Sequence, residues 1–467
     1  MRLYNSLTKK IETFAPLKKG QVSLYSCGPT VYERVHIGNL SAFIISDTLR
    51  RVLAAERYSL KHVMNFTDVD DKTIRRSQEQ YAELAPRPAL NKLTQKYSET
   101  FVNDMWTAGN DTDNMIFVKA TDNIAKMQQL ITELYDKKFA YIAEDGVYFS
   151  IAAYRNSGKN YGQLTKITTN LSQARVASDE YDKANASDFA LWKRQKSGEP
   201  AWDFAIDRQN LPGRPGWHIE CSAMSSAMLG QPFDIHTGGV DLKFPHHENE
   251  IAQSTAGHDD PLYAKFFVHN EHILIDAQKM SKSLNNFFTL ADLQNKGYDP
   301  LSFRLLVLQA HYRSQVHFSF NNLQKAAERL KALNNMAVLR WQAQPKASAP
   351  IVFENEAKNL LSTLQNDLDT PKAMSQIAKV QKIIEANLLP VSSKSAFEAW
   401  LGVIDQLFGL QLLQQSDIDQ SQKQLIAQRQ AARQTKNWAK SDQLRAQLAE
   451  QGLGLNDTSL GPIWYRL

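Results

Sequence analysis

The feature that most limits the possible folds is a strand–helix–strand pattern near the start of the chain. An apolar run at 21–27 predicts a buried strand, and a second strand is expected to end at Thr67. Between them, from Asn39 to about Ala55, apolar residues recur every three or four positions, as in an amphipathic helix. Such a unit predicts a parallel sheet, whose ligands bind at the carboxyl ends of the strands. Cys27 and Thr67 should therefore lie beside each other at a pocket.

The composition is that of an ordinary globular protein. Of 467 residues, 43% are hydrophobic and 22% are charged, which suits several domains with a sizeable core. We find no apolar run long enough for a membrane span or a signal peptide, so no membrane partner is expected. Two cysteines are too few for a disulfide framework, which predicts a reducing, cytoplasmic location.

The positive charge is concentrated at the end of the chain. The net charge is +5, and residues 421–467 hold seven Lys/Arg against three Asp/Glu, a net +4. A basic terminal module suggests a polyanionic partner. On charge alone, a solvated Lys-rich helix explains the pattern at least equally well.

The pattern along the chain predicts an α/β protein in several parts. A Rossmann-type parallel sheet is interrupted by an insertion that ends near GRPGW, and a helical bundle and a small mixed α/β module follow. The expected parts are the first half of the sheet domain at 1–75, the insertion at 76–215, the second half at 216–289, the helical region at 290–404 and the C-terminal module at 405–467.

Two cysteines, a histidine and a glutamate form a candidate metal site. Cys27 ends the first strand, and Cys221 lies in GRPGWHIECSAM. In FPHHENEIAQS, His246 and Glu250 are four residues apart and would share one face of a helix. Two thiolates, an imidazole and a carboxylate can hold one zinc ion tetrahedrally. The spacing alone leaves His247 as an alternative to His246, and two inert buried cysteines as the alternative to a metal site.

Two short motifs have the chemistry of a nucleotide site. HIGN, at 36–39, leads into the first long helix, whose N-terminus attracts anions. There His36 can donate to a phosphate, and Gly38 lets a ligand approach the backbone closely. KMSKS, at 279–283, places two lysines where both can reach a phosphate chain. Each motif alone is a weak indication, since surface loops with two lysines are common.

Taken together, HIGN and KMSKS about 240 residues later resemble the two halves of the active site of class I aminoacyl-tRNA synthetases. Further blocks narrow the resemblance to the bacterial type of cysteinyl-tRNA synthetase: CGPTVY, NFTDVDDK, DFALWK, RPGWHIECSAM, FDIHTGGVDLKFPHHENEIAQS, KMSKSLNNFFT and HYRSQ. The resemblance runs essentially from end to end. It departs at Asn39, where the family often has histidine, and in NMIFVKATDNI, so no role is carried over to residues 118–123.

The resemblance implies a cytoplasmic, monomeric ligase that activates L-cysteine with ATP and Mg²⁺ and transfers it to tRNA(Cys). One Zn²⁺ per chain would be held by Cys27, Cys221, His246 and Glu250. The catalytic residues would be His36, Asn39, Lys279 and Lys282. The contacts to ATP would come from Gly28, His36, Gly38, Asn39, Gly238, Gly239, Asp241 and Lys282. The cysteine pocket would contain Thr67, Trp217 and His236, with a core aromatic as the alternative role for Trp217. The tRNA anticodon would be contacted by Arg433, Trp438, Asp442 and Asp457.

A metal would give such an enzyme its selectivity. Cysteine and serine differ by one atom, and an apolar pocket separates such near-isosteres by only about 1–3 kcal/mol. A thiolate is a strong, soft metal ligand, whereas the hydroxyl of serine is a poor one and stays protonated. The resemblance therefore implies that zinc reads the substrate side chain without a separate editing site.

Two alternative functions fit part of the pattern. The cysteine ligase of mycothiol synthesis resembles the same family in both nucleotide motifs and the zinc site, but it should lack an anticodon-reading C-terminal module. A catalytically silent, synthetase-like RNA-binding protein should have decayed motifs, whereas both lysines of KMSKS and all four zinc positions are present here.

Overall fold

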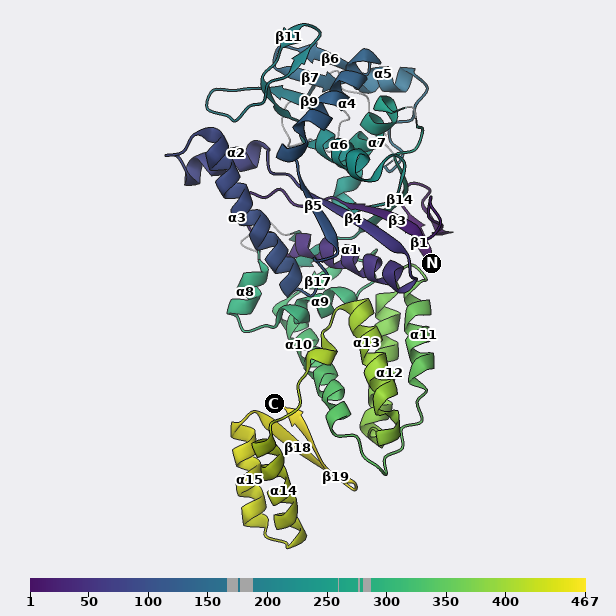
Figure 1. Cartoon of the computed structure of the whole chain (residues 1–467), viewed down its shortest axis with the longest axis vertical. Helices are drawn as coiled ribbons and strands as arrows, with labels where there is room; N and C mark the ends of the chain where they lie inside the picture. The colour runs from purple at the N-terminus through teal and green to yellow at the C-terminus, as the bar shows by residue number, and fades with distance from the viewer. Residues whose placement is uncertain (166–174, 177–187, 259, 276–277, 280–286) are drawn as a thin grey trace. The chain divides into compact units, whose positions relative to one another are not determined.

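The protein is described by a computed structural model over residues 1–165, 175–176, 188–258, 260–275, 278–279 and 287–467 (Figure 1). The chain divides into two compact units. Unit 1 comprises Met1–Leu293 with Tyr312–His317, and unit 2 comprises Gln294–His311 with Phe318–Leu467. Among the described residues, no helix combines the length and the apolar character that crossing a membrane requires.

The centre of unit 1 is a five-stranded parallel sheet, which confirms the predicted fold class. The strand order is β14-β13-β3-β4-β5, and each neighbouring pair is parallel. The bounds are β3 Gln21–Ser26, β4 Ser59–Phe66, β5 Met115–Lys119, β13 Phe233–Gly239 and β14 Ala264–Asn270. The carboxyl ends of β3 and β13 are adjacent, since Ser26 pairs with Thr237. Cys27 follows β3 directly, so it lies at the edge of the sheet where a ligand is expected.

Helix α1, Ile37–Ala55, connects β3 to β4 and begins two residues before the predicted start. The reason is a cap that the apolar periodicity does not reveal: the side chain of His36 accepts a hydrogen bond from the backbone N–H of Asn39 (3.2 Å). Buried residues along α1, among them Leu40, Ile44 and Leu49, form the predicted apolar face.

Strand β5 lies within the range expected for the insertion, yet it pairs with β4 at the edge of the parallel sheet. Only Met115 of its five residues is fully buried. No strand was predicted for this segment, and its place in the parallel sheet is set by pairing with β4, a contact that local spacing does not reveal. Its neighbour Thr121 is held by Asp68, whose carboxylate accepts from the backbone N–H (2.9 Å) and the hydroxyl of Thr121 (2.5 Å).

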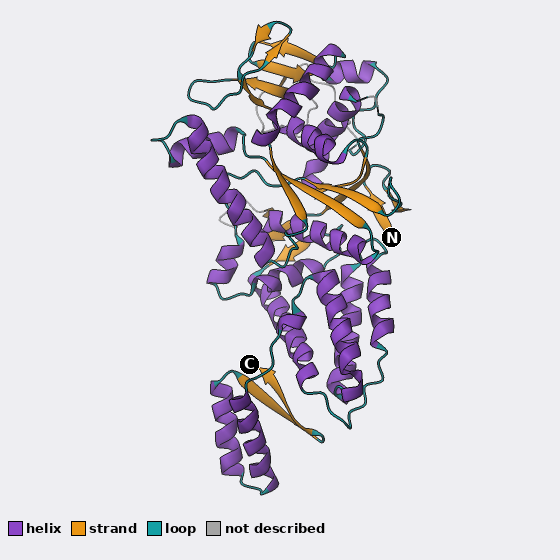
Figure 2. Cartoon of the chain, in the orientation of Figure 1, coloured by secondary structure: helices purple, strands orange, loops and turns teal. Residues whose placement is uncertain are grey.

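The rest of unit 1 contains a second sheet, of order β12-β9-β7-β6 with β8 beside β9, and its strands form a group apart from the parallel sheet (Figure 2). The hairpin predicted from YIAEDGVYFSI is β6–β7. The strands of this region are β6 Ala140–Ala143, β7 Gly146–Phe149, β8 Arg175–Val176, β9 Asp188–Arg194, β10 Ala205–Ile206, β11 Gln209–Asn210 and β12 Gly213–Pro215. Besides α1, the α-helices of unit 1 up to residue 257 are α2 Asp71–Gln80, α3 Pro86–Thr107, α4 Ile124–Asp136, α5 Ile151–Asn156, α6 Trp217–Leu229 and α7 Glu248–Gly257.

The remaining short strands are β1 Arg2–Asn5, β2 Lys10–Thr13, β15 Ile273–Ile275, β16 Gln278–Lys279 and β17 Val316–Phe318. The motif KMSKS begins at the last residue of β16, and residues 280–283 lie outside the described part of the chain.

Unit 2 is mainly helical, as predicted, and ends in two helices followed by the antiparallel hairpin β18–β19. A small core joins this end of the chain to the preceding helices: Val338, Ile418, Leu448, Leu453, Leu455 and Trp464. The bounds are α8 Leu290–Asn295, α9 Pro300–Leu308, α10 Phe320–Ala337, α11 Phe353–Leu364, α12 Thr370–Asn387, α13 Lys394–Phe408, α14 Gln420–Gln434, α15 Trp438–Glu450, β18 Leu453–Thr458 and β19 Gly461–Arg466. Helix α13 runs through the boundary expected at 404–405, and α8 begins before the division between the units.

The loop after β3 lies against the end of β4 at a position that requires glycine. The backbone N–H of Gly28 donates to the side-chain oxygen of Asn65 (2.9 Å). A Cβ atom at position 28 would lie 1.7 Å from the backbone oxygen of Asn65. Close packing of these two backbones therefore fixes the direction in which Cys27 and the following loop leave the sheet.

We expect Gly28→Ala to destabilise the protein by about 1–3 kcal/mol, because the added methyl group must push the loop away from β4. The free energy of unfolding in urea, followed by circular dichroism, measures this change. The matched control is Gly402→Ala in α13, where the nearest heavy atom is 3.5 Å from the added Cβ. That variant should gain about 0.5–1 kcal/mol. Equal stability of Gly28→Ala and the unmodified protein would contradict the close-packing argument.

Candidate functional site

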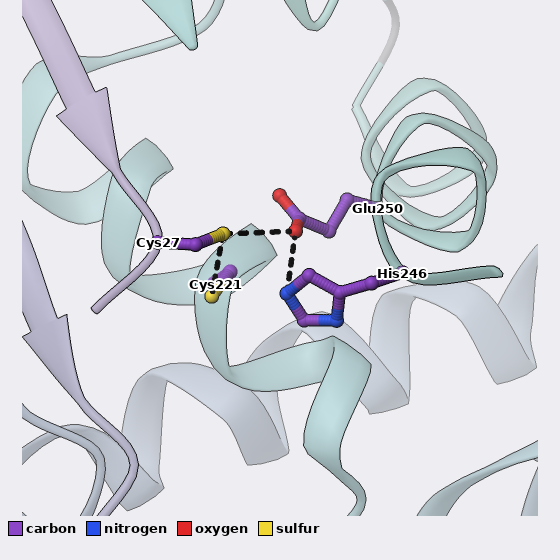
Figure 3. Close-up of side chains that lie close together, drawn as sticks. All are labelled: Cys27, Cys221, His246 and Glu250. Carbon is purple, nitrogen blue, oxygen red and sulfur yellow. Dashed lines mark hydrogen bonds and ion pairs between the residues drawn. The ribbon is translucent and has the colours of Figure 1, made fainter. Parts of the chain in front are cut away.

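The structure brings together the two cysteines, the histidine and the glutamate that the sequence singled out (Figure 3). Cys27 follows β3, Cys221 lies on α6, and Glu250 lies in the first turn of α7. As the four-residue spacing predicted, the side chains of His246 and Glu250 meet. His246 lies in the π-helical turn Lys243–His247, which runs directly into α7 and is broken only before His246, at Phe244. All four side chains are buried.

Two separations between the ligand atoms match those of a tetrahedral zinc site, and a third is shorter. Sγ of Cys27 lies 3.8 Å from Sγ of Cys221 and 3.7 Å from Oε1 of Glu250. With zinc bond lengths of about 2.3 Å to sulfur and 2.1 Å to oxygen, a tetrahedron requires about 3.8 Å and about 3.6 Å. Nε2 of His246 lies 2.8 Å from Oε1 of Glu250, closer than the roughly 3.3 Å of two ligands on one zinc ion. A hydrogen bond joins these two atoms. Two of these three separations match a tetrahedral site, and all four donor atoms lie within 4.8 Å of one another, so the cluster can hold a metal ion.

A second set of four shares two of these residues. His236 and His247, together with Cys27 and Glu250, also place their donor atoms within 4.8 Å of one another. Nε2 of His247 lies 3.3 Å from Sγ of Cys27. The choice between His246 and His247, which the spacing left open, is therefore also open on proximity alone. The set with His246 includes both thiols, the softer donors.

Charges within the cluster favour ligands without protons on the carboxylate and on one thiol. Burial acts to raise the pKa of Glu250, but His236 and His246 outweigh it, so this pKa lies well below its usual range. Burial acts to lower the pKa of His246, but Glu250 and Cys221 raise it to about 10. Burial raises the pKa of the Cys27 thiol. Burial acts in the same direction on Cys221, but Cys27 and His246 outweigh it and lower the pKa of Cys221 to about 6. A bound metal ion would take the place of the proton shared between His246 and Glu250 and would deprotonate both thiols.

Beside the cluster, unit 1 contains a cavity of about 550 Å³, a volume that suits a nucleotide-sized ligand. Cys27 lies on its wall, and so does Trp217, whose ring stacks on His246 with centroids 4.2 Å apart. The cavity is thus continuous with the metal cluster. The predicted residues that line it are Cys27, Gly28, His36, Gly38, Asn39, Trp217, Gly238, Gly239 and Asp241.

Two details show how the chain shapes this cavity. Nδ1 of His36 caps α1, which holds its ring at the cavity wall beside the N-terminus of the helix. A Cβ atom at Gly238 would lie 2.8 Å from Leu242 and 2.9 Å from His247, so glycine is required where β13 meets the site. The cap brings the N-terminus of α1 to the cavity surface, and the glycine brings the backbone of β13 there.

Two residues predicted for the cysteine pocket lie behind the cavity wall. The hydroxyl of Thr67 donates to Oε2 of Glu220 (2.8 Å), and its backbone is bonded to that of Pro29 and Val31. Nε2 of His236 lies 2.7 Å from Oε2 of Glu250. Thr67 and His236 are 1% and 0% exposed, so in this structure they support the residues of the wall.

The positions of the KMSKS lysines relative to the cavity are not described by the structure. The backbone of Lys279 lies in β16, and Lys282 lies outside the described residues. Their predicted contact with a phosphate chain is therefore not part of the described geometry.

The sequence analysis missed several buried polar groups around the cluster, in particular Glu220 and Tyr263. Oε1 of Glu220 is buried without a hydrogen-bond partner in the structure. The hydroxyl of Tyr263 donates to Oε2 of Glu250 (2.9 Å). Glu220 gave a recognisable pattern, a carboxylate beside a cysteine in a helix of mainly small and apolar residues. Tyr263 gave none, because a tyrosine at the start of a strand is usually a packing residue.

A hydrogen-bonded network supports the floor of the cavity. Oγ of Ser26 lies 2.7 Å from Oγ of Ser46, 2.8 Å from Nε2 of His62 and 2.7 Å from Oγ1 of Thr237. Ser26, Ser46 and Thr237 line the cavity, whereas His62 is buried below them. The network joins α1, β3, β4 and β13 at one point.

In unit 2, three of the four residues predicted to contact tRNA surround a smaller cavity of about 250 Å³: Arg433, Trp438 and Asp457. The guanidinium of Arg433 lies over the exposed ring of Trp438, 5.6 Å from its centroid. Arg429, which the sequence analysis did not identify, binds Asp457 through two hydrogen bonds of 2.7 and 2.9 Å. Asp442, the fourth predicted residue, is exposed on α15.

Comparisons with known proteins agree with these observations. Residues 13–328 match the family described as tRNA synthetases class I (C) catalytic domain, and residues 415–458 match the cysteinyl-tRNA ligase anticodon binding domain. The cysteine–tRNA ligase of Leptospira interrogans is 37% identical over 99% of both chains. That of Solibacter usitatus is 38% identical over 100% of this chain and 99% of the relative. These matches confirm the resemblance that the motifs indicated.

Solved structures show the same fold at much lower identity. Methionyl-tRNA synthetase of Mycobacterium tuberculosis, in complex with methionyl-adenylate, has a TM-score of 0.61 at 10% identity, covering 84% of this chain and 93% of that one. A LeuRS–tRNA–LeuAMS complex of Agrobacterium radiobacter K84 also has a TM-score of 0.61 at 10% identity, covering 87% and 86%. At this identity the likeness concerns the fold alone.

We expect His62→Gln to reduce the loss of stability on acidification. Burial and the nearby Arg50 lower the pKa of His62 to about 3, with Asp47 opposing. An unfolded histidine titrates near pH 6.5, so below that pH the unfolded chain binds a proton that the folded chain does not. Stability therefore falls as the pH falls from 6.5, and at pH 5 the His62 contribution amounts to about 2 kcal/mol.

Urea unfolding of both proteins at pH 7 and pH 5 measures this difference. The other buried histidines contribute equally to the pH dependence of both proteins, so their contributions cancel when the two free-energy changes are compared. The same loss of stability in the variant and the unmodified protein would show that His62 is not a buried neutral group.

Proposed function

Because the chain belongs to the cysteine–tRNA ligase family of class I synthetases, we propose that it joins L-cysteine to tRNA(Cys) in an ATP-dependent reaction. The observation that supports this most strongly is the buried Cys/His/Glu cluster beside a nucleotide-sized cavity. One wall residue, Cys27, belongs to both, so a small ligand at the cluster and a larger one in the cavity would meet there.

The metal of this site would be one Zn²⁺, held by the ligand set Cys27, Cys221, His246 and Glu250. Its donor spacing supports this choice, and it alone includes both cysteines. When bound, the zinc ion would supply a site for the thiolate of the substrate, which the hydroxyl of serine fills poorly. Trp217 would close one side of the amino-acid site through its stack on His246.

In the first step, the carboxylate of cysteine attacks the α-phosphate of ATP, which forms cysteinyl-adenylate and releases pyrophosphate. The protein supplies no nucleophile, so its contribution is to hold the reactants and to stabilise charge on the phosphates. His36 and Asn39 at the N-terminus of α1 would bind the phosphates on one side. Lys279 and Lys282 would bind them on the other, with Mg²⁺ accompanying ATP.

The nucleoside part of ATP would lie along the end of β13. Gly238 and Gly239 line the cavity there, and so does Gly28 after the neighbouring strand β3. The carboxylate of Asp241 also lines the cavity and is a candidate acceptor for a ribose or adenine group.

In the second step, the 2′-hydroxyl of the terminal adenosine of tRNA attacks the carbonyl of the adenylate and AMP leaves. The anticodon would be read in unit 2 by Arg433, Trp438, Asp442 and Asp457. Single-stranded bases are recognised by stacking on aromatic or guanidinium planes and by hydrogen bonds at their edges. The arginine over an exposed tryptophan, beside an aspartate, offers both kinds of contact.

A charging assay with cysteine, ATP and tRNA(Cys) tests the proposed function directly. Cysteinyl-tRNA should form, and cysteine-dependent exchange of ATP with pyrophosphate should accompany it. Exchange without charging would indicate a ligase with a different acceptor, such as the amino sugar of mycothiol synthesis. The absence of both would indicate a silent RNA-binding protein, so either result contradicts the proposal.

We expect Cys221→Ser to lose bound zinc and to reduce cysteine-dependent pyrophosphate exchange by about 100-fold or more, because even groups outside the coordination sphere change metal affinity by 10–100-fold. Zinc content by elemental analysis and the exchange rate are the two measurements. Ser222→Ala is the matched control, since this neighbouring buried hydroxyl makes only hydrogen bonds of 3.5 Å. Full zinc content in Cys221→Ser would contradict the assignment of this ligand.

We expect Asp457→Asn to raise the KM for tRNA in the charging reaction by roughly 10-fold, because a lost base contact costs about 1–3 kcal/mol. Asparagine keeps one oxygen for Arg429, so the local fold should persist. Pyrophosphate exchange without tRNA should not change. The control is Asp417→Asn, another acidic residue of unit 2 that pairs with a cation, Lys423. Charging at the original KM would contradict the anticodon role of Asp457.

A further inference from the structure

Tyr263, just before β14, joins the two helices that carry candidate metal ligands. Its hydroxyl donates to Oε2 of Glu250 on α7 (2.9 Å), lies 2.7 Å from Oγ of Ser225 on α6, and lies 3.4 Å from the backbone oxygen of Cys221. The hydroxyl has one proton, and the ionised carboxylate of Glu250 is a stronger acceptor for it than the neutral hydroxyl of Ser225, although Ser225 lies closer. Ser225 can then donate to the oxygen of Tyr263.

The two oxygens of Glu250 therefore have different neighbours. Oε1 faces the metal cluster, 2.8 Å from Nε2 of His246 and 3.7 Å from Sγ of Cys27. Oε2 faces away from it, toward Nε2 of His236 (2.7 Å) and the hydroxyl of Tyr263 (2.9 Å). Two hydrogen-bonding groups thus hold one oxygen of a completely buried carboxylate on the side opposite to the thiols.

The position of Oε2 decides how many donor atoms the protein supplies to the metal ion. A carboxylate binds a metal ion through one oxygen or through both. If both oxygens of Glu250 turned toward the ion, the protein would supply five donor atoms. If Oε2 is retained by its hydrogen bonds, the protein supplies four, and zinc can expand to a fifth ligand.

We propose that Tyr263 is a positioning residue that keeps Glu250 bound to the metal through Oε1 alone and so keeps one coordination position open for the thiol of the substrate. The inference rests on the proposed function, because it takes the metal and the cysteine substrate from it. Tyr263 itself touches neither the cavity nor the thiol groups of the protein. It acts on specificity through Glu250, since the open position is where cysteine and serine are told apart.

The effect of the Tyr263 hydroxyl can be measured separately from the packing of its ring. The ring of Tyr263 lies against Phe233 and Phe267, with centroids 5.1 and 6.4 Å away. Tyr263→Phe keeps these contacts and removes only the hydroxyl. His236 would still hold Oε2, so the carboxylate loses one of its two restraints and can turn toward the metal.

A matched control, Tyr154 on α5, bonds to the same helix, α7. Tyr154 is also buried, and its hydroxyl bonds to Oγ1 of Thr255 on α7 (2.8 Å). Tyr154→Phe therefore removes a buried hydrogen bond to α7 without touching Glu250. A purely structural role for Tyr263 would make the two variants behave alike.

The test uses the full-length protein, with its metal exchanged for Co²⁺, whose visible absorption is intense in four-coordinate sites and weakens as ligands are added. The unmodified protein and Tyr154→Phe should show intense bands that change when cysteine is added. Tyr263→Phe should show weaker bands before cysteine is added. Its KM for cysteine in pyrophosphate exchange should rise by about 10- to 100-fold, with a smaller change in kcat.

The inference is overturned if Tyr263→Phe matches Tyr154→Phe in both the cobalt spectrum and the KM for cysteine. A failure of the proposed function looks different, because the unmodified protein would then bind no cobalt or show no cysteine-dependent exchange. If Tyr263→Phe does not fold, Ser225→Ala carries the same test. It leaves the ring and the hydroxyl of Tyr263 in place but removes the group that directs the hydroxyl proton toward Glu250, so it should shift the spectrum and the KM in the same direction by a smaller amount.

Discussion

The architecture around the pocket depends on one buried charge, the carboxylate of Glu250. An ionised carboxylate with no exposed surface is costly unless charges and hydrogen bonds around it compensate for the lost water. Glu250 has these partners in His246, His236 and Tyr263. They come from the turn before α7, from β13 and from the start of β14, so satisfying this single charge fixes three elements relative to one another.

The same constraint connects the metal cluster to the cavity. His246, held by Glu250, supports the ring of Trp217, which lines the cavity. Cys27 belongs to the cluster, and the next residue, Gly28, is pressed against β4 so closely that no side chain fits. A reactant at the cluster and a nucleotide in the cavity would therefore be held by neighbouring residues of one rigid loop. Such pre-set positions are what a reaction without a protein nucleophile requires.

The sequence predicted the parts of this account that depend on local spacing. The run at 21–27 and the periodicity after Asn39 predicted adjacent parallel strands joined by a helix, and the interval between His246 and Glu250 predicted that these side chains meet. The motif blocks identified the family, which the comparisons confirm.

Contacts between residues far apart in the chain were beyond the sequence alone. No strand was predicted for β5, and its place at the sheet edge follows from pairing with β4. Tyr263, 13 residues after Glu250, reaches its carboxylate across the connection between α7 and β14, which no spacing rule reveals. Arg429 likewise meets Asp457, 28 residues later, only because the last hairpin folds back onto α14.

The central claim is that the metal held by the cluster reads the thiol of the substrate. Zinc K-edge X-ray absorption of the zinc-loaded protein tests it most directly, because it counts the sulfur atoms bound to the ion. Two sulfur ligands, from Cys27 and Cys221, are predicted for the free protein and for the protein with serine, and three after cysteine is added. A count that stays at two with cysteine, under conditions in which cysteine is activated, would contradict the account and make the metal a structural element only.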